Sequence, residues 1–342
     1  MKSVRFTASV AALAAAAWIG GASGALAYTA CQSTDTGGVD DKGFNQTAWK
    51  GMQDAQKALG VESKLLESKK EADYVPNINS FVKEKCDIIV TVGFLLGDAT
   101  KAAAAANKDI KFSIVDFAYD PAIPNVLGQV YATDEAAFLA GYLAAGVSKS
   151  GVVGTFGGIN IPPVTIFMTG FYNGVQYYNK AKNKTVKVLG WDPAKKTGLF
   201  TNNFEKLDDG KTFAKNLYDE KADIVMPVAG PVGIGSAALA TELGAAKLKI
   251  IGVDVDQYVT DPEHKTVFLT SVLKRMDATV VEAIKQGKDG TFKGGVIVGT
   301  LKSGGVGLAP YHDLDSAVPA DLKAEIEKLG AGIKDGSIKV GG

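Results

Sequence analysis

The residues whose types are best suited to binding a ligand or to chemistry lie in one stretch near the N-terminus, Asp35-Thr-Gly-Gly-Val-Asp-Asp-Lys-Gly-Phe-Asn-Gln46. It combines carboxylates with an aromatic ring at Phe44 and an amide at Asn45. Carboxylates and amides form directed hydrogen bonds, and an aromatic ring offers a face for stacking. The stretch therefore indicates recognition of a small polar ring. The alternative is structural: Phe44 staples the start of a helix and the aspartates cap it.

Two more carboxylates follow apolar runs. Asp116 comes after Phe112-Ser-Ile-Val115, and Asp254 comes after the run 247–253. A carboxylate at the end of a strand can accept paired hydrogen bonds from sugar hydroxyls or from the edge of a base. We expect Asp35, Asp116 and Asp254 to project from sheet edges toward one cleft, and helix capping or solvation in a loop is the alternative for each.

Two other side chains are candidates from their surroundings. Phe204 is a lone aromatic in the polar run Thr201-Asn-Asn-Phe-Glu205, and Lys274 follows the strand-like run that begins at Leu269. The alternatives are that Phe204 anchors its loop and that Lys274 lies on a solvated helix face.

The residues give little support for catalysis. The two histidines, His264 and His312, lie in loop-like surroundings, and no nucleophile elbow or metal-ligand spacing of cysteine and histidine occurs. Gly233-Ile-Gly235 resembles a dinucleotide fingerprint, but Ala229-Gly-Pro-Val232 separates it from its strand, whereas the dinucleotide turn is tight. We predict a protein that is not an enzyme and has no cofactor and no metal; an exported nucleosidase is the less favoured alternative.

Strands and helices alternate along the chain, which predicts parallel sheets with right-handed crossovers. In such sheets ligands bind beyond the carboxyl ends of the strands, where the candidate side chains fall. The expected strands cover 28–34, 62–66, 87–92, 112–116, 151–156, 186–191, 223–228, 247–253, 267–272 and 296–301. The expected helices include one from Phe44, one from about Pro163, one from Lys274 and one over 320–334.

The two halves of the chain repeat one pattern. Ile89-Val-Thr-Val-Gly93 followed by Phe112-Ser-Ile-Val-Asp116 matches Ile224-Val-Met-Pro-Val228 followed by Ile250-Ile-Gly-Val-Asp254. Two such α/β lobes can face each other across a cleft, which is a common place for a ligand.

Composition limits the possible partners and the location. The 342 residues carry 37 basic and 37 acidic side chains, so no field of one sign favours nucleic acid. Lys2 and Arg5, the short apolar run 8–19 and Ala25-Leu-Ala27 form a signal-peptide pattern, which predicts export and a mature chain from Tyr28. No other stretch is long and apolar enough to cross a bilayer.

The sequence leaves three states open for the two cysteines. If the strands near Cys31 and Cys86 are neighbours, a disulfide can form in an oxidising compartment. Cys31 could instead carry a lipid anchor, although Tyr28 stands where that signal needs an aliphatic residue, or both thiols could be free.

Together these motifs resemble the basic membrane protein family of ABC-transporter substrate-binding proteins, whose best-understood type is a purine-nucleoside receptor. The resemblance covers the chain from Cys31 to the C-terminus. It rests on the stretch 35–46 and on Val92-Gly93-Phe94, Val115-Asp116, Gly170-Phe171 with Gly174, Val228-Ala-Gly230, Gly252-Val-Asp-Val-Asp-Gln257 and Ser271-Val-Leu-Lys274.

The resemblance implies a type I periplasmic-binding fold of two lobes joined by three hinge crossings, with 28–134 and 258–305 in the first lobe and 135–257 and 306–342 in the second. It implies a monomer that binds a nucleoside and delivers it to a membrane permease. Phe44 and Phe204 match the aromatics that sandwich the base, Asp116 the carboxylate on the base, and Asp254 and Lys274 the ribose contacts. Asp35 and Asn45 line the site, as do the turns with Gly93-Phe94 and Gly230. Another small ligand, such as a sugar or a signalling molecule, is the alternative.

The chain also departs from the family pattern. Gly43 replaces a serine at the helix start, which predicts a weakened cap. Gln32-Ser33-Thr34 is polar for a buried strand, and the loop 195–201 is long, which makes the match of Phe204 less direct.

Overall fold

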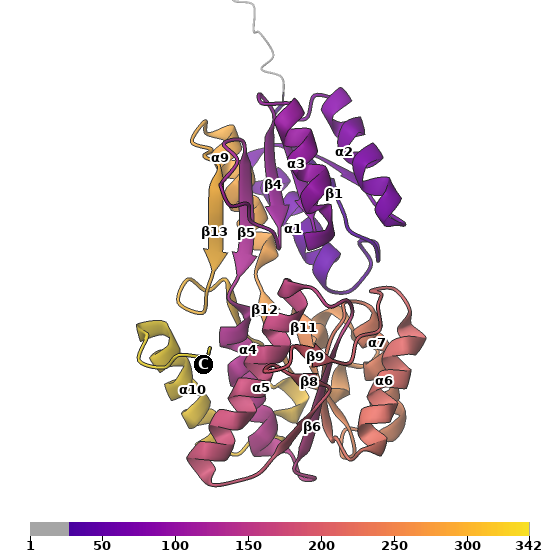
Figure 1. The fold of residues 1–342 in the computed structure, drawn as a ribbon, viewed down its shortest axis with the longest axis vertical. Coiled ribbons are helices and arrows are strands. Elements are labelled where there is room, and N and C mark those ends of the chain that lie inside the picture. The colour runs from indigo at the N-terminus through magenta and orange to yellow at the C-terminus, as the bar shows by residue number, and fades with distance from the viewer. Residues whose placement is uncertain (1–26, 342) are drawn as a thin grey trace, which may run out of the picture.

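The computed structural model describes residues 27–341 (Figure 1). The signal peptide predicted at 1–27 lies, apart from its last residue, outside the described residues. The described chain forms two α/β lobes stacked along the long axis of the molecule. Each lobe is built on a six-stranded sheet, which confirms the predicted fold class.

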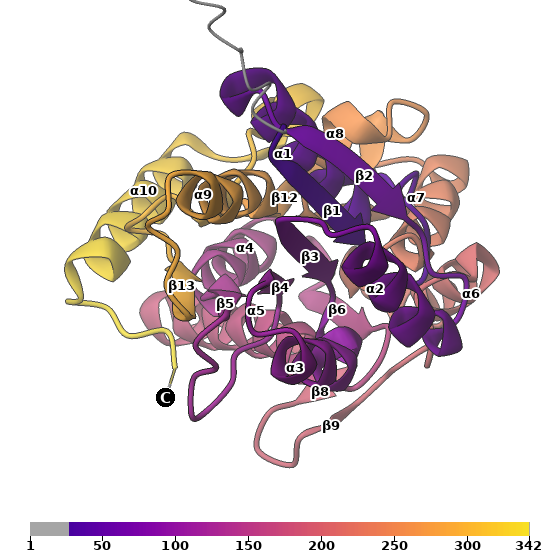
Figure 2. The same ribbon diagram turned by 90° about the horizontal axis from the view of Figure 1, so that it is seen from above.

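The first lobe holds the strands nearest the N-terminus and one late strand. In spatial order its sheet consists of β13 (Gly295–Gly299), β5 (Val126–Tyr131), β4 (Lys111–Val115), β3 (Ile88–Val92), β1 (Thr29–Ser33) and β2 (Glu62–Leu66). All neighbours in it are parallel. Figure 2 shows two helices on each face of this sheet, α1 (Phe44–Leu59) and α9 (Met276–Lys288) on one, and α2 (Tyr74–Lys83) and α3 (Gly97–Ala106) on the other.

The second lobe repeats this order. Its sheet runs β14 (Val306–Leu308), β12 (Phe268–Lys274), β11 (Lys249–Asp254), β10 (Ile224–Val228), β6 (Val152–Gly157) and β7 (Lys187–Leu189). Only β14 is antiparallel to its neighbour within this sheet of the described chain. The helices are α4 (Thr133–Val147), α5 (Pro162–Lys182), α6 (Leu207–Asp219), α7 (Val232–Leu243), α8 (Gln257–Thr260) and α10 (Ala320–Asp335). The predicted repeat therefore corresponds to β3 and β4 in one lobe and to β10 and β11 in the other.

Local sequence explains how the helices pack. In α1 the buried residues include Ala48, Met52 and Ala55, which recur three or four residues apart and place one apolar stripe against the core. In the second lobe α5 lies close against α4. A Cβ atom at Gly174 would come within 1.9 Å of the carbonyl oxygen of Phe138, so this approach requires glycine. This close packing fixes the first turns of α5, which reach the cleft.

The chain passes between the sheets three times, after β5, β12 and β13. We expected residues 258–305 in the first lobe, but β12 pairs with β11 and β14 in the second sheet. The chain thus returns to the first lobe only after Lys274, and that part of the predicted boundary is wrong. An apolar strand such as 268–274 does not itself indicate which of two similar sheets it joins.

Other differences are local. The expected strands do not include β5 and β14. Lys274 ends β12 instead of opening a helix, since α9 begins at Met276. The polar loop after β7 contains a small hairpin, β8 (Trp191–Asp192) with β9 (Thr197–Gly198). None of the helices in residues 27–341 has the length and apolar character needed to cross a membrane.

Cys31 and Cys86 form a disulfide, with their Cα atoms 6.1 Å apart. Cys31 lies on β1 directly beside β3, and Cys86 comes two residues before β3 begins. The disulfide confirms one of the three predicted states, and it uses the Cys31 thiol that a lipid anchor would need.

Candidate functional site

A pocket lies between the two lobes at the carboxyl ends of their strands. About 580 Å³ in it is not filled by protein atoms, and part of this space is open to solvent. The structure brings all the predicted ligand-binding residues to its wall: Asp35, Phe44, Asn45, Gly93, Phe94, Asp116, Phe204, Gly230, Asp254 and Lys274. Their roles as ligand contacts remain predictions.

The first turn of α1 is held by Asp41. Its carboxylate accepts hydrogen bonds from the backbone N–H groups of Gly43, Asn45 and Gln46 at 2.7–3.0 Å. The expectation of a weakened cap at Gly43 is therefore wrong, because a buried carboxylate two residues earlier satisfies the free donors of the helix. This cap fixes Phe44 and Asn45 at the pocket, so the structural and the functional interpretation of the stretch are compatible.

Asp116 and Asp254 occupy equivalent places in the two lobes. Asp116 directly follows β4, Asp254 ends β11, and both have left-handed backbone conformations, with φ of 68° and 70°. Such a conformation costs a residue with a side chain about 1–2 kcal/mol, although aspartate tolerates it better than most. It turns both carboxylates from their sheet edges into the pocket.

Lys274 joins these two carboxylates. Its Nζ lies 2.5 Å from Asp116 Oδ2 and 4.0 Å from Asp254 Oδ1, and 4.9 Å from the centre of the Phe44 ring. Because Lys274 belongs to the second sheet and Asp116 to the first lobe, this ion pair connects the lobes inside the pocket.

Burial changes the acidity of the pocket carboxyl groups. It raises the pKa of Asp254 to about 7, while Lys274 acts in the opposite direction and the Asp116 carboxylate adds to the increase. Burial also raises the pKa of Asp116, against the effect of Lys274. At Asp35 burial raises the pKa to about 6, although the Tyr74 hydroxyl and the Thr36 N–H both donate to its Oδ1.

The pocket has aromatic walls from both lobes. Phe44 comes from α1, and Phe204 comes from the segment after β9 in the second lobe, where its ring packs on Gly158. A side chain at Gly158 would meet that ring at 2.2 Å, so glycine is required there. The loop that appeared long forms the β8–β9 hairpin, which leaves Phe204 at the pocket.

Several residues of the wall were not predicted from the sequence, and Phe167 is the largest of them. It lies on the second turn of α5, five residues after the helix begins at Pro162, and its ring centre is 5.7 Å from Lys274 Nζ. Its position in a helix that starts at the predicted cleft is the signal that could have identified it. The others are Thr36, Asp41, Ile161, Pro163, Val164, Val228, Ala229, Pro231 and Val253.

Other residues of the motifs named above lie outside the pocket. Asp256, which belongs to the motif 252–257, has its Oδ2 2.7 Å from His312 Nε2 and does not line the pocket. Gly235, in the dinucleotide-like motif, allows close packing, because a side chain there would come within 1.8 Å of the carbonyl oxygen of Leu207.

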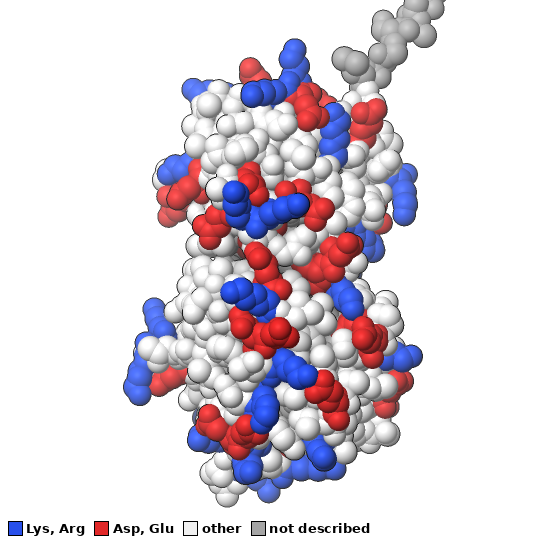
Figure 3. All heavy atoms as spheres, turned by 90° about the vertical axis from the view of Figure 1, so that its right-hand side faces the viewer, with Lys and Arg blue, Asp and Glu red and all other residues white. Residues whose placement is uncertain are grey.

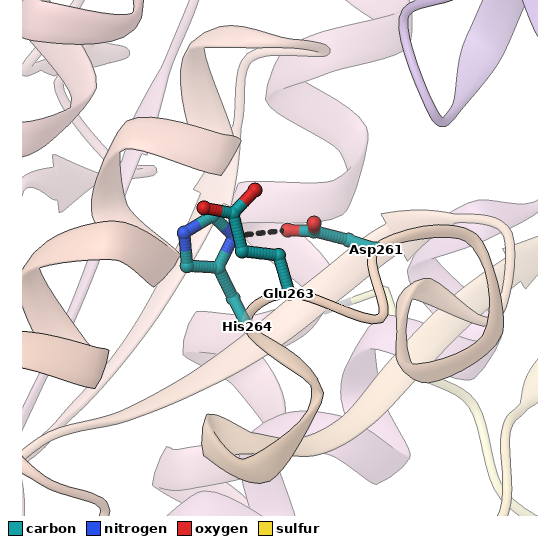
Figure 4. Close-up of side chains that lie close together, drawn as sticks. All are labelled: Asp261, Glu263 and His264. Carbon is teal, nitrogen blue, oxygen red and sulfur yellow. Dashed lines mark hydrogen bonds and ion pairs between the residues drawn. The ribbon is translucent and has the colours of Figure 1, made fainter.

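A group with the residue types of a metal site lies outside the pocket. Side-chain atoms of Asp261, Glu263 and His264 fall within 4.8 Å of one another (Figure 4). Asp261 Oδ2, however, is 2.7 Å from His264 Nδ1, and Asp261 Oδ1 is 2.8 Å from Lys42 Nζ. Both oxygens of the central carboxylate therefore already have protein partners.

Charge is mixed on the outer surface and unbalanced in the pocket. Figure 3 shows basic and acidic side chains interspersed over both lobes on one face. Among the described residues that line the pocket, by contrast, Asp35, Asp41, Asp116 and Asp254 stand against a single cation, Lys274.

Comparison with known proteins gives consistent matches. Residues 29–341 match the family model described as ABC transporter substrate-binding protein PnrA-like. The chain is 33% identical to the ABC transporter nucleoside-binding protein BmpA of Lactococcus lactis, over 90% of this chain and 87% of that protein. It is 32% identical to basic membrane protein A of Borreliella burgdorferi, over 87% and 83%. Among solved structures, an ABC transporter solute-binding protein from Aeropyrum pernix K1 superposes with a TM-score of 0.81 at 26% identity, over 91% of this chain and 92% of that one.

Proposed function

This chain belongs to the family of PnrA-like ABC transporter substrate-binding proteins, and we propose that it binds a nucleoside, with a purine as its base, between its lobes and delivers it to a membrane permease. One observation carries the proposal: two aromatic side chains from opposite lobes line the same pocket as the Asp116–Lys274–Asp254 cluster. The relative from Lactococcus lactis, which is named as nucleoside-binding, supports this choice of ligand.

The aromatic walls suit the base of a nucleoside. Phe44 belongs to the first lobe and Phe204 to the second, so a flat ring between them contacts both lobes. Stacking on an aromatic side chain contributes about 1–3 kcal/mol per base and accepts any base. Binding in this manner favours closure of the lobes, because only the closed state offers both faces.

The polar groups suit the rest of the ligand. In this proposal Asp35, Asn45 and Asp116 bond the edge of the base, and Asp254 and Lys274 bond the ribose hydroxyls. The buried side-chain oxygen of Asn45 supports a ligand that donates, because the amide nitrogen already donates to the Thr36 carbonyl oxygen and the oxygen has no partner in the described chain. A ligand without matching donors would leave such groups unsatisfied, at a cost of about 1–3 kcal/mol each.

The proposed role of this binding is in transport. We propose that the protein is exported by its N-terminal signal, acts as a monomer without enzymatic activity, and exchanges the ligand with its permease by opening and closing at the three crossings. No nucleic-acid partner is part of the proposal. The family's solute-binding relatives support the absence of catalysis.

The test is calorimetric titration of the mature chain, residues 28–342, with inosine, adenosine and guanosine. We expect saturable binding of at least one of them. No binding of any of the three at millimolar concentrations would overturn the ligand assignment. Mass spectrometry of small molecules released from protein purified without added nucleoside then identifies a sugar or a signalling molecule if one is the true ligand. Release of free base during a prolonged incubation with nucleoside would reveal a nucleosidase.

A further inference from the structure

A second set of contacts joins the lobes outside the ligand pocket. Lys42 lies just before α1 in the first lobe, and Thr260 and Asp261 lie at the end of α8 in the second. Lys42 Nζ is 2.8 Å from Asp261 Oδ1, and the Thr260 hydroxyl donates to the Lys42 carbonyl oxygen at 2.7 Å. None of the three residues lines the pocket. Lys42 instead borders a wide groove next to the pocket, and the groove and the pocket have Asp41 and Pro231 in common.

The carboxylate of Asp261 is buried and already oriented for this contact. Its side chain is fully buried, whereas that of Lys42 is 32% exposed. His264 Nδ1 contacts the other carboxylate oxygen at 2.7 Å, which fixes the orientation of the carboxylate (Figure 4). A partly buried ion pair with a fixed partner contributes more than an exposed one, because solvent screens it less and less side-chain freedom is lost.

The contact also reaches the pocket wall through the backbone. Lys42 has a left-handed conformation, with φ of 53°, and directly follows Asp41, which caps α1 and thereby places Phe44 and Asn45. The segment that meets the second lobe at Lys42 is thus the segment that carries two pocket residues. A movement of Lys42 relative to Asp261 changes the position of this wall.

We propose that Lys42, Asp261 and Thr260 are positioning residues that form a rim latch, which holds the lobes closed over the bound ligand and sets its rate of release. This role rests on the proposed function in assuming a ligand in the cleft. When the lobes separate, Lys42 and the Thr260 hydroxyl lose their partners to water while Asp261 keeps His264, so the latch stabilises only the closed state. Its loss therefore accelerates dissociation and leaves association nearly unchanged.

The experiment compares Lys42→Met, Asp261→Asn and Thr260→Val with the wild type. A stopped-flow chase measures dissociation of the tightest-binding nucleoside among inosine, adenosine and guanosine. We expect dissociation about 5- to 50-fold faster for Lys42→Met and Asp261→Asn and a few-fold faster for Thr260→Val, with association within about twofold. The double variant Lys42→Met, Asp261→Asn should dissociate about as fast as Lys42→Met alone, because both substitutions remove the same ion pair. Lys42→Arg, which keeps the positive charge, should retain most of the slow dissociation of the wild type. Lys64→Met is the matched control, since Lys64 pairs with Glu84 at the same 2.8 Å but within one lobe.

Small-angle X-ray scattering separates this inference from the proposed function. Without nucleoside, Lys42→Met and Thr260→Val should have a larger radius of gyration than the wild type and Lys64→Met. If the wild type binds no nucleoside, the proposed function fails, and scattering still decides on the latch. Equal scattering of the variants and the wild type, or dissociation from Lys42→Met as slow as from Lys64→Met, would overturn it. If circular dichroism shows that Asp261→Asn is unfolded, Lys42→Met and Thr260→Val, one from each lobe, decide the question.

Discussion

Replacement of Asp254 by asparagine should stabilise the protein at neutral and alkaline pH. In the folded chain burial raises the pKa of Asp254 to about 7, well above the value of about 4 for an aspartate in water. A raised carboxyl pKa means that stability is highest below the unfolded-state value and is lost as the pH rises through the folded-state value. Ionised Asp254 therefore destabilises the native state above pH 7.

The size of this effect follows from the two pKa values. A separation of about three pH units, at 1.36 kcal/mol each, corresponds to at most about 4 kcal/mol above pH 7. The asparagine side chain has nearly the same shape, accepts the left-handed backbone and cannot ionise. Lys274 keeps Asp116 as its partner at 2.5 Å, so the substitution leaves no unpaired ammonium.

Urea unfolding followed by circular dichroism between pH 4 and pH 8.5 measures the difference. We expect the free energy of unfolding of Asp254→Asn to exceed that of the wild type at pH 8 by about 1–4 kcal/mol, with the excess vanishing near pH 4. Asp54→Asn, at a partly exposed aspartate on α1, is the control. If Asp254→Asn is less stable at pH 8, or differs from the wild type equally at every pH, Asp254 does not have the buried and strained charge that this reasoning assigns to it.

Three further predictions concern the ligand and the disulfide. Phe44→Ala should weaken nucleoside binding about 5- to 150-fold in calorimetry, corresponding to the 1–3 kcal/mol of one stacked face; an unchanged affinity would argue for a ligand held by hydrogen bonds alone. Adenosine monophosphate should bind at least about 100-fold more weakly than adenosine, because four aspartates and one lysine line the pocket and repel a phosphate; similar affinities in a competition titration would contradict this charge argument. The Cys31→Ser, Cys86→Ser double variant should lose about 2–5 kcal/mol of unfolding free energy, since the disulfide spans 55 residues; equal urea midpoints of the variant and the wild type would show that the crosslink contributes little.

The sequence predicted the pocket better than the lobe boundaries because the two depend on different kinds of information. Strand ends are local features: an apolar run followed by aspartate identified both Asp116 and Asp254, and parallel pairing then placed them at sheet edges. The sheet to which β12 belongs is not a local feature. Residues 268–274 have the same apolar character as strands of either sheet, and only pairing with β11 decides the matter.

Polar residues in buried places were interpreted less well, and for a physical reason. Gln32 and Ser33 lie on β1 with no exposed surface, although a polar run favours solvent, and the polar atoms of their side chains have no hydrogen-bond partner within the described chain. Asp41 was not distinguished from the other carboxylates of the stretch 35–46, whereas it satisfies the helix donors that Gly43 leaves free. For Asp41 the residue type can be read from the sequence, but the three backbone N–H groups that make its burial acceptable cannot, and they decide its role.

The contacts between the lobes were the least predictable from the sequence. They are also the contacts that depend on whether the lobes are open or closed. Lys274 lies 158 residues from Asp116, and Lys42 lies 219 residues from Asp261, so neither pair leaves a periodic or spaced signal in the chain. Both pairs exist only while the lobes meet, one inside the pocket and one at its rim. A ligand that engages Asp116 and Lys274 competes with the inner pair but leaves the rim latch intact. The two pairs should therefore affect binding differently: Lys274→Met should change which ligands are accepted, and Lys42→Met should change how long each one stays. A variant at Lys42 that altered base preference, with dissociation rates unchanged, would show that the rim and the pocket are not separate in this way.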